Sequence, residues 1–176
     1  MKTKTVLLVL LAALLAACSS SSPVESSSTE GRFSVIAPAA LKEQPQTIDT
    51  SSGKTGSHTF LVEKNNITYV VAYTDFLAEI VTSGDPQYML SNARDTMISS
   101  IQGTLTTETN ITLNKFPGRD MTVAIIMPDG LGGIMRARIY LVGNRLYQVM
   151  VWTHKADAKD PSVARFLDSF KLISSQ

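Results

Sequence analysis

The chain has 176 residues, with 16 Lys or Arg against 15 Asp or Glu, so its formal net charge is +1 at pH 7. This near-neutral balance excludes the basic excess that nucleic-acid-binding domains carry, so no nucleic-acid partner is expected. The single cysteine excludes an intrachain disulfide, so the fold must rest on its apolar core. The length fits one domain plus a short leader.

The first 17 residues have the layout of a cleaved export signal. Lys2 and Lys4 form a short positive region, and residues 6–15 are only Val, Leu and Ala. A transmembrane anchor is the alternative. A helix over residues 6–17 would span roughly 18 Å, whereas the hydrocarbon core of a bilayer is ~30 Å thick. We therefore predict a signal peptide over residues 1–17.

The segment Leu15-Ala16-Ala17-Cys18 resembles the lipobox of bacterial lipoproteins. The resemblance implies cleavage between Ala17 and Cys18 and acylation of Cys18. A plain secretory signal with an incidental cysteine is the alternative, but it would leave one unpaired thiol. Two or more acyl chains hold a protein on a membrane without a spanning helix. Membrane contact through acylated Cys18 is therefore the first partner prediction.

Residues 18–30 are predicted to form a flexible tether, because they are rich in serine and almost without apolar side chains. Their composition leaves residues 31–176 as the folded domain. In the lipoprotein family, aspartate directly after the cysteine tends to retain the protein in the inner membrane. Ser19 and Ser20 occupy these positions here. The resemblance thus implies an outer-membrane lipoprotein facing the periplasm.

The first half of the domain is predicted to hold short strands at 32–36, 46–50, 59–63 and 67–74. The run 64–66, Lys-Asn-Asn, joins the last two strands as a hairpin. Asp85 and Pro86 then have the residue types of a helix cap and a first helical position. The apolar face of this helix, which should end at Gly103, contains Leu90, Ala93, Met97 and Ile101.

The second half is predicted to hold four hairpin-linked strands, at 105–113, 119–127, 133–142 and 145–153. Gly143-Asn144 is a two-residue turn signal between the last two. Asp160 and Pro161 repeat the cap-and-proline start, and an amphipathic helix follows. Hairpins interrupted by helices predict the α+β class, with a single antiparallel sheet flanked by helices.

Five segments together resemble the PsbP/Mog1-like superfamily: Gly31–Pro38, Tyr69–Tyr73, Phe116–Arg119, Asn144–Tyr147 and Arg165–Phe170. The resemblance covers about residues 31–173 and implies that family's small α+β fold. Members include a photosystem II extrinsic subunit, a Ran-binding protein and uncharacterised bacterial lipoproteins, and they are non-enzymatic where understood. The lipobox makes this chain most similar to the last group. A shared fold does not transfer a function.

One candidate binding patch follows from strand alternation. Arg136, Arg138 and Tyr140 share one face of a strand, and Arg145 and Tyr147 lie across the Gly143-Asn144 turn. Together they could recognise an anionic ligand or a partner protein. The alternative is a solvated sheet face on which each arginine is paired with a carboxylate.

The sequence offers no catalytic or metal constellation. Its two histidines, His58 and His154, lie far apart, with no second ligand at metal-binding spacing. The G-x-S-x-G elbow and the phosphate-binding glycine loops are missing from the sequence. We therefore expect no metal, no cofactor and no enzymatic activity.

Three functions remain open at this stage. The first is a lipid-anchored envelope protein whose domain binds another envelope protein or supports an assembly. The second is a periplasmic module that binds a small molecule or ion in a cleft between sheet and helix. The third, a hydrolase with a noncontiguous site, is the weakest, because nothing pairs a base with a nucleophile.

Overall fold

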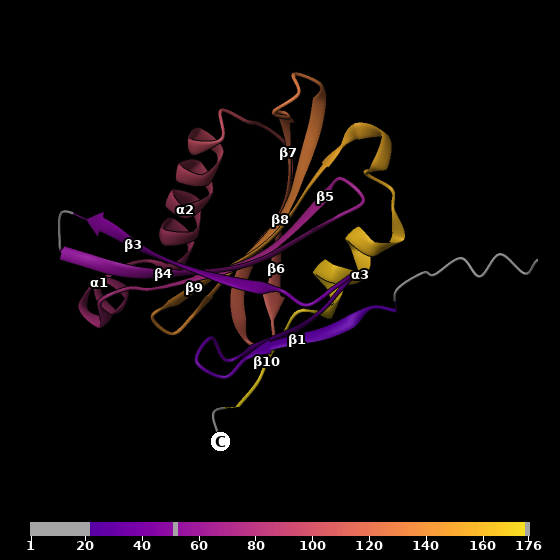
Figure 1. The fold of residues 1–176 in the computed structure, drawn as a ribbon. Helices are drawn as coiled ribbons and strands as arrows, with labels where there is room; N and C mark the ends of the chain where they lie inside the picture. Colours follow the sequence, from indigo (N-terminus) through magenta and orange to yellow (C-terminus); the bar gives the residue numbers. More distant parts are fainter. Residues whose placement is uncertain (1–21, 51–52, 175–176) are drawn as a thin grey trace, which may run out of the picture.

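The computed structural model of the protein describes residues 22–50 and 53–174. Within these residues, seven strands form one antiparallel sheet in the order β3-β4-β5-β9-β8-β7-β6, the centre of the molecule in Figure 1. The bounds are β3 (Lys42–Thr50), β4 (Gly53–Lys64), β5 (Ile67–Asp75), β6 (Thr104–Leu113), β7 (Phe116–Ile126), β8 (Gly132–Val142) and β9 (Arg145–His154).

The other elements cover this large sheet. Three short strands form a second antiparallel sheet in the order β1-β2-β10 within the described part of the chain. Their bounds are β1 (Val24–Ser28), β2 (Phe33–Ala37) and β10 (Lys171–Leu172). The helices are α1 (Ala78–Ser83), α2 (Pro86–Ser100) and α3 (Pro161–Ser169), with a 3-10 turn η1 (Lys155–Asp157). Across residues 22–50 and 53–174, no helix is long and apolar enough to cross a membrane.

Helix α2 covers one face of the large sheet. Its buried Leu90 and Met97 pack with Met121, Met135 and other inward side chains of β7 and β8. Strand alternation explains the pattern, because every second residue of these strands points to this face. Four buried methionines of this cluster, Met97, Met121, Met135 and Met150, fill the irregular gap between a helix and a twisted sheet.

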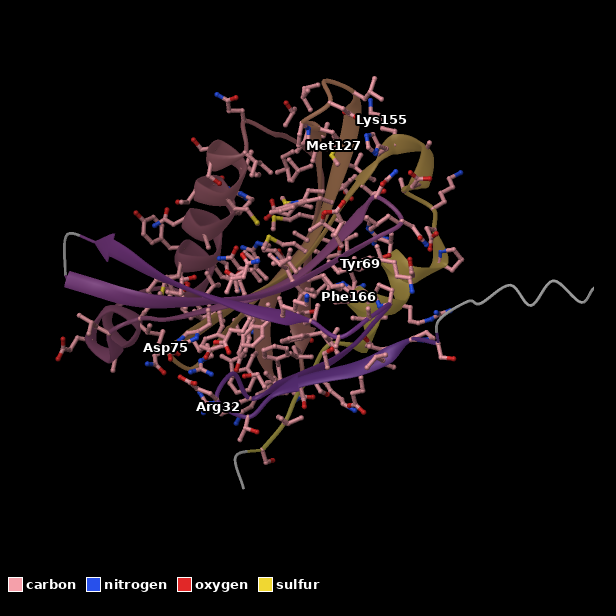
Figure 2. All side chains as sticks on the ribbon, viewed as in Figure 1. Arg32, Tyr69, Asp75, Met127, Lys155 and Phe166 are labelled. Atoms are coloured by element: carbon pink, nitrogen blue, oxygen red, sulfur yellow. The ribbon has the colours of Figure 1, made fainter. Side chains whose placement is uncertain are left out.

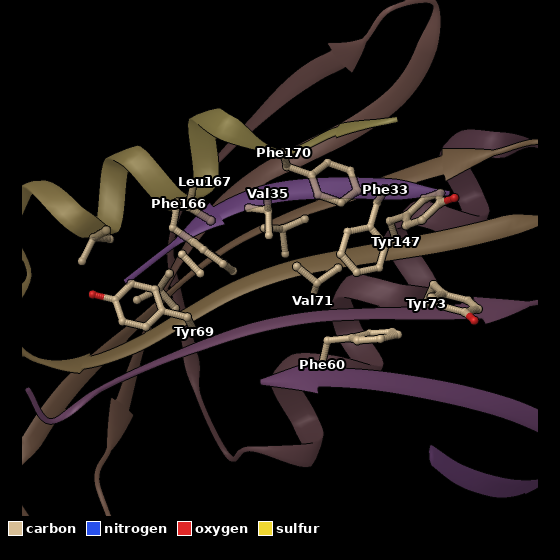
Figure 3. Packing of buried hydrophobic residues seen from close by; sticks show 14 of the residues in the cluster. Phe33, Val35, Phe60, Tyr69, Val71, Tyr73, Tyr147, Phe166, Leu167 and Phe170 are labelled. Carbon is tan, nitrogen blue, oxygen red and sulfur yellow. The ribbon is translucent and has the colours of Figure 1, made fainter. Parts of the chain in front are cut away.

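The opposite face is covered by β2 and α3 together, so the large sheet is buried on both sides (Figure 3). This second core is aromatic. Phe33 of β2 lies edge-on to Phe60 at 5.2 Å, and Phe166 of α3 lies edge-on to Tyr69 at 5.2 Å. Phe170 stacks 5.9 Å from Phe33 and closes the layer.

The α+β class and the main elements predicted from the sequence are confirmed. Both helix starts have the expected caps: Asp85 accepts a hydrogen bond from the Gln87 N–H, and Asp160 accepts one from the Ser162 N–H. The β8–β9 hairpin turns at Gly143, whose positive φ of 59° suits glycine. The structure differs from the predicted single sheet in one respect, because β1, β2 and β10 form a separate small sheet.

The prediction of a flexible tether up to Glu30 is wrong from Val24 onward. Residues 24–28 form β1, which pairs with β2 over its whole length. Backbone hydrogen bonds order this serine-rich strand, and the Ser26 hydroxyl also accepts one from the Leu41 N–H. Serine composition alone therefore did not distinguish a linker from an edge strand. The predicted signal peptide, Cys18 and residues 19–21 lie outside the described residues.

The fold makes a first prediction about α3. Because Phe166 is fully buried, Phe166→Ala should cost about 3–5 kcal/mol of unfolding free energy through lost contacts and a cavity. Denaturant unfolding measures this cost. The exposed Leu131→Ala serves as the control and should stay within about 0.5 kcal/mol of the parent. Equal effects of the two substitutions would contradict the packing of α3 on the sheet.

Candidate functional site

The five residues of the predicted patch share one sheet face, as alternation predicted, but they do not form an exposed surface. Tyr140, Arg145 and Tyr147 are only 4%, 6% and 1% exposed. Tyr140 stacks on Phe170 with ring centres 5.9 Å apart, and the Tyr147 hydroxyl donates to the Gly31 carbonyl at 2.8 Å. The second layer, β2 and α3, lies over this face and corrects the patch prediction.

Arg145 binds groups of its own chain. Its guanidinium donates to both carboxylate oxygens of Asp75 at 2.6 Å and to the Glu30 carbonyl at 2.7 Å. It also lies 4.1 Å from the centre of the Tyr73 ring. The hydrogen bonds from Arg145 lower the pKa of Asp75 below its ordinary value of 3.8. This arginine is therefore satisfied within the domain.

Arg138 is paired as well. It donates to Asp120 at 2.7 Å and to Asp168 at 2.7 Å, and also to the Leu167 carbonyl at 2.9 Å. The last contact neutralises a carbonyl at the C-terminal end of α3, where cations are favoured. Arg136 is half-buried on the same face. Arg138 and Arg145 are thus paired with carboxylates, as the alternative to a binding patch predicted.

The polar pocket of the domain lies elsewhere, between the end of β2, the β4–β5 turn and the start of α3. Its volume is about 520 Å³. We call it the α3 pocket. Its polar lining consists mainly of Lys64, Asn65, Tyr69, Asp160, Ser162 and Arg165. These residues come from three distant parts of the sequence, so local motifs gave no signal of the pocket apart from the Asp160 cap.

A chain of hydrogen bonds organises one wall of the α3 pocket. The Ser162 hydroxyl donates to Asp160, and the Tyr69 hydroxyl lies 2.6 Å from the Ser162 oxygen. The hydrogen bonds from Ser162 hold the pKa of Asp160 below its usual range, while burial raises the pKa of Tyr69. At neutral pH the wall therefore presents one carboxylate and neutral hydroxyls.

The pocket has two cations, Lys64 and Arg165, against the one carboxylate of Asp160. This charge balance suits a small anionic group. The Ser162 hydroxyl has the carboxylate of Asp160 and the Tyr69 phenol as hydrogen-bond partners, and neither histidine lines the pocket.

Both histidines have partners of their own. His58 Nδ1 lies 2.8 Å from Glu43, and the ring stacks on Tyr73 at 4.6 Å. His154 Nε2 lies 2.8 Å from Asp129 in the β7–β8 turn. Among the described residues, no group of three or more His, Cys, Asp or Glu side chains is placed to hold a metal ion.

A further ionic cluster that the sequence did not reveal joins α2 to the sheet. Glu108 of β6 accepts from Arg94 of α2 at 2.8 Å and pairs with Arg119 of β7 at 3.1 Å. Arg119 also donates to the Gln87 amide oxygen at 2.6 Å. Arg94 and Glu108 are half-buried and Arg119 is buried, whereas Gln87 is exposed in the first turn of α2, so the cluster positions the helix on the sheet. No sequence pattern pairs residues so far apart.

The Arg145–Asp75 pair predicts a pH-dependent stability. Asp75→Asn should lower the free energy of unfolding by about 1–2 kcal/mol at neutral pH. The loss is limited to this size because the Asp75 carboxylate is half-exposed and water screens the ion pair. Because the pKa of Asp75 is lowered on folding, its contribution is complete above the ordinary value of 3.8 and is lost as the pH falls through the lower folded value. Denaturant unfolding of both proteins across this range should show the difference shrinking. A constant difference would contradict the ion pair.

Comparison with known protein structures identifies the type of fold. No protein-family model and no curated protein matches the sequence. The structure is similar to cyanobacterial PsbP (CyanoP) from Synechocystis sp. PCC 6803, with a TM-score of 0.56 and 11% identity over 86% of this chain and 92% of that one. A protein of unknown function from Pseudomonas aeruginosa matches at a TM-score of 0.40 and 10% identity, over 65% of this chain and 85% of that one. The chain therefore has a PsbP-like fold.

Proposed function

We propose that this chain is a lipid-anchored bacterial envelope protein whose domain is a non-catalytic module that binds a protein or supports an assembly. The observation that carries the proposal is Cys18. It is the one cysteine of the chain, and it ends the run Leu15-Ala16-Ala17-Cys18 directly after an apolar leader. Acylation gives this thiol a role that an intrachain disulfide cannot, because the chain has no second cysteine.

The arrangement of the domain supports a non-catalytic role. Arg138 and Arg145 are engaged in ion pairs within the fold. Ser162, the hydroxyl at the α3 pocket, has no histidine beside it to act as a base. The sequence resemblance to a superfamily of non-enzymatic members points the same way.

The outer membrane, on its periplasmic side, is the location we propose. Ser19 and Ser20 follow the cysteine in place of the aspartate that tends to retain lipoproteins in the inner membrane.

A partner surface is suggested by the segment that links β5 to α2. Leu77 of this segment is 54% exposed, and Tyr88 in the first turn of α2 is 64% exposed. Exposed aromatic and aliphatic anchors beside a polar rim are typical of protein-binding surfaces. We propose that the envelope partner binds here.

A second candidate function is the binding of a small anionic molecule. The specific observation in its favour is the α3 pocket, where Lys64 and Arg165 outnumber the carboxylate of Asp160. In this case the domain would be a periplasmic small-molecule or ion-binding module.

The anchor is tested by intact mass spectrometry of the protein extracted from membranes, compared with Cys18→Ala. We expect a mature chain that starts at Cys18 and carries added acyl chains, while the Cys18→Ala protein is not acylated and leaves the membrane fraction. A soluble, unmodified wild-type protein would contradict the anchor and favour a diffusing binding module.

The partner surface is tested by crosslinking and pulldown from the same membranes. Leu77→Ala combined with Tyr88→Ala should strongly reduce recovery of the crosslinked envelope protein, because truncation of anchor side chains commonly costs 2 kcal/mol or more of binding energy. Both side chains are exposed, so the melting temperature should hardly change. Lys64→Ala with Arg165→Ala is the matched control at the α3 pocket. If only the Lys64→Ala, Arg165→Ala protein lost the crosslinked envelope protein, the α3 pocket would be favoured as the binding site over Leu77 and Tyr88.

A further inference from the structure

One end of the large sheet collects several loops. In the strand register, Lys64 pairs with Ile67 at the β4–β5 turn, Gly133 with His154, and Ile126 with Gly132 at the β7–β8 turn. The Asp129–His154 contact ties the β7–β8 turn to the end of β9. Figure 2 labels Met127 and Lys155 at this end, and Asp75 and Arg32 at the other. We call the first the hairpin end.

The described chain begins on the same side. Val24, the first residue of β1, pairs with Ala37. Ala37 and Pro38 line the α3 pocket together with Pro23 and with Lys64 of the β4–β5 turn. Figure 1 shows the start of β1 beside α3 at the right of the molecule, with η1 above them and the β7–β8 turn at the top of the view. The chain therefore enters the domain at the hairpin end.

Exposed apolar side chains concentrate at this end. Among the residues whose burial the structure describes, six large hydrophobic side chains are exposed, and four of these belong to the hairpin end. Ile126, the last residue of β7, is 73% exposed, and Leu131 in the β7–β8 turn is 60% exposed. Val24 and Ile36 lie beside the point where the chain enters the domain. An apolar hollow of about 230 Å³, lined by Ile126, Met127 and Trp152, lies beneath the turn.

The β7–β8 turn is preorganised to present these side chains. The Met127 N–H donates to the Leu131 carbonyl at 2.8 Å, and the Gly130 N–H donates to the Met127 carbonyl at 2.8 Å. The carboxylate of Asp129 accepts from the Leu131 N–H and faces His154, so it is turned toward the domain. The apolar groups thus need little ordering energy before contact.

The length of chain before β1 limits how far this end can lie from an anchor. Five residues, 19–23, separate Cys18 from Val24. Even fully extended, six residue steps reach at most about 22 Å, whatever conformation they adopt. An acyl chain on Cys18 would therefore keep the start of β1, and the hairpin end with it, close to the lipid headgroups.

We propose that the hairpin end lies on the bilayer, with Ile126 and Leu131 entering the boundary between headgroups and acyl chains. This inference rests on the proposed acylation of Cys18. The charges of this end balance, because its turns and adjoining elements hold four cations and four carboxylates: Lys64, Lys155, Lys159 and Arg165 against Glu63, Asp129, Asp157 and Asp160. Apolar contact therefore carries the interaction, and salt should affect it little.

The test uses the full acylated protein with a new cysteine at Leu131→Cys, labelled with an environment-sensitive fluorophore such as NBD. Tyr88→Cys is the matched control, since its side chain is 64% exposed at the start of α2, away from the hairpin end. Each protein is reconstituted into vesicles of phosphatidylethanolamine and phosphatidylglycerol without other proteins. Flotation of the vesicles reports the anchor, and the emission wavelength reports the surroundings of the label.

We expect both proteins to float and only the label at position 131 to shift to shorter wavelength, with the shift retained in 1 M salt. Adding Ile126→Asp should reduce the shift without affecting flotation. Flotation with no shift at position 131, or with equal shifts at both positions, would overturn the inference and leave the anchor intact. A shift at position 131 that appears only after native membrane proteins are added to the same vesicles would assign this end to a protein partner and also overturn the inference. Failure to float, with no acyl mass, would remove the anchor and the inference together.

Discussion

The arrangement of the small sheet on the large sheet depends on the hydrogen bonds that the guanidinium of Arg145 donates. This guanidinium joins β9, where it originates, to the end of β5 through Asp75, and to the β1–β2 turn through the Glu30 carbonyl. Tyr147, two residues later on the same strand face, binds the next carbonyl of that turn, Gly31. The two side chains thus fix the small sheet on the large one at one point.

Such a buried cation is stable only because each of its faces and edges is used. A guanidinium without partners would be costly to remove from water. Here its edges meet the carboxylate of Asp75 and a backbone carbonyl, while its plane lies over Tyr73. Aromatic stacking suits arginine better than lysine, because the guanidinium is planar and weakly hydrated. The same position could not be filled by a simple apolar residue without leaving Asp75 and the Glu30 carbonyl unpaired.

The sequence was sufficient for the class of fold and for many of its elements, because these depend on neighbours in the chain. Asp85 and Asp160 could be identified as caps from the proline that follows each one. The prediction of an exposed binding patch was wrong for a different reason. Alternation assigns Tyr140 and Tyr147 to a face, but it does not say what covers that face, and the cover comes from β2 and α3, far away in sequence. The α3 pocket could not be predicted for the same reason, because its lining comes from distant parts of the sequence. Residues 24–28 form an ordered strand because their backbone pairs with β2, and their serine-rich composition does not indicate this pairing.

The fixed turn between β1 and β2 also determines where the chain enters the domain. Arg145 and Tyr147 hold Glu30 and Gly31 at the end of the sheet where β5 finishes and β9 begins. From there β1, traced back toward its start, runs antiparallel to β2 and reaches Val24 beside the α3 pocket, at the opposite end. A protein held through its N-terminal segment would consequently turn the hairpin end to the membrane. It would leave the exposed side chains of Leu77, after β5, and Tyr88, in the first turn of α2, on the side that faces away from the membrane. A partner would then have to approach from the aqueous compartment.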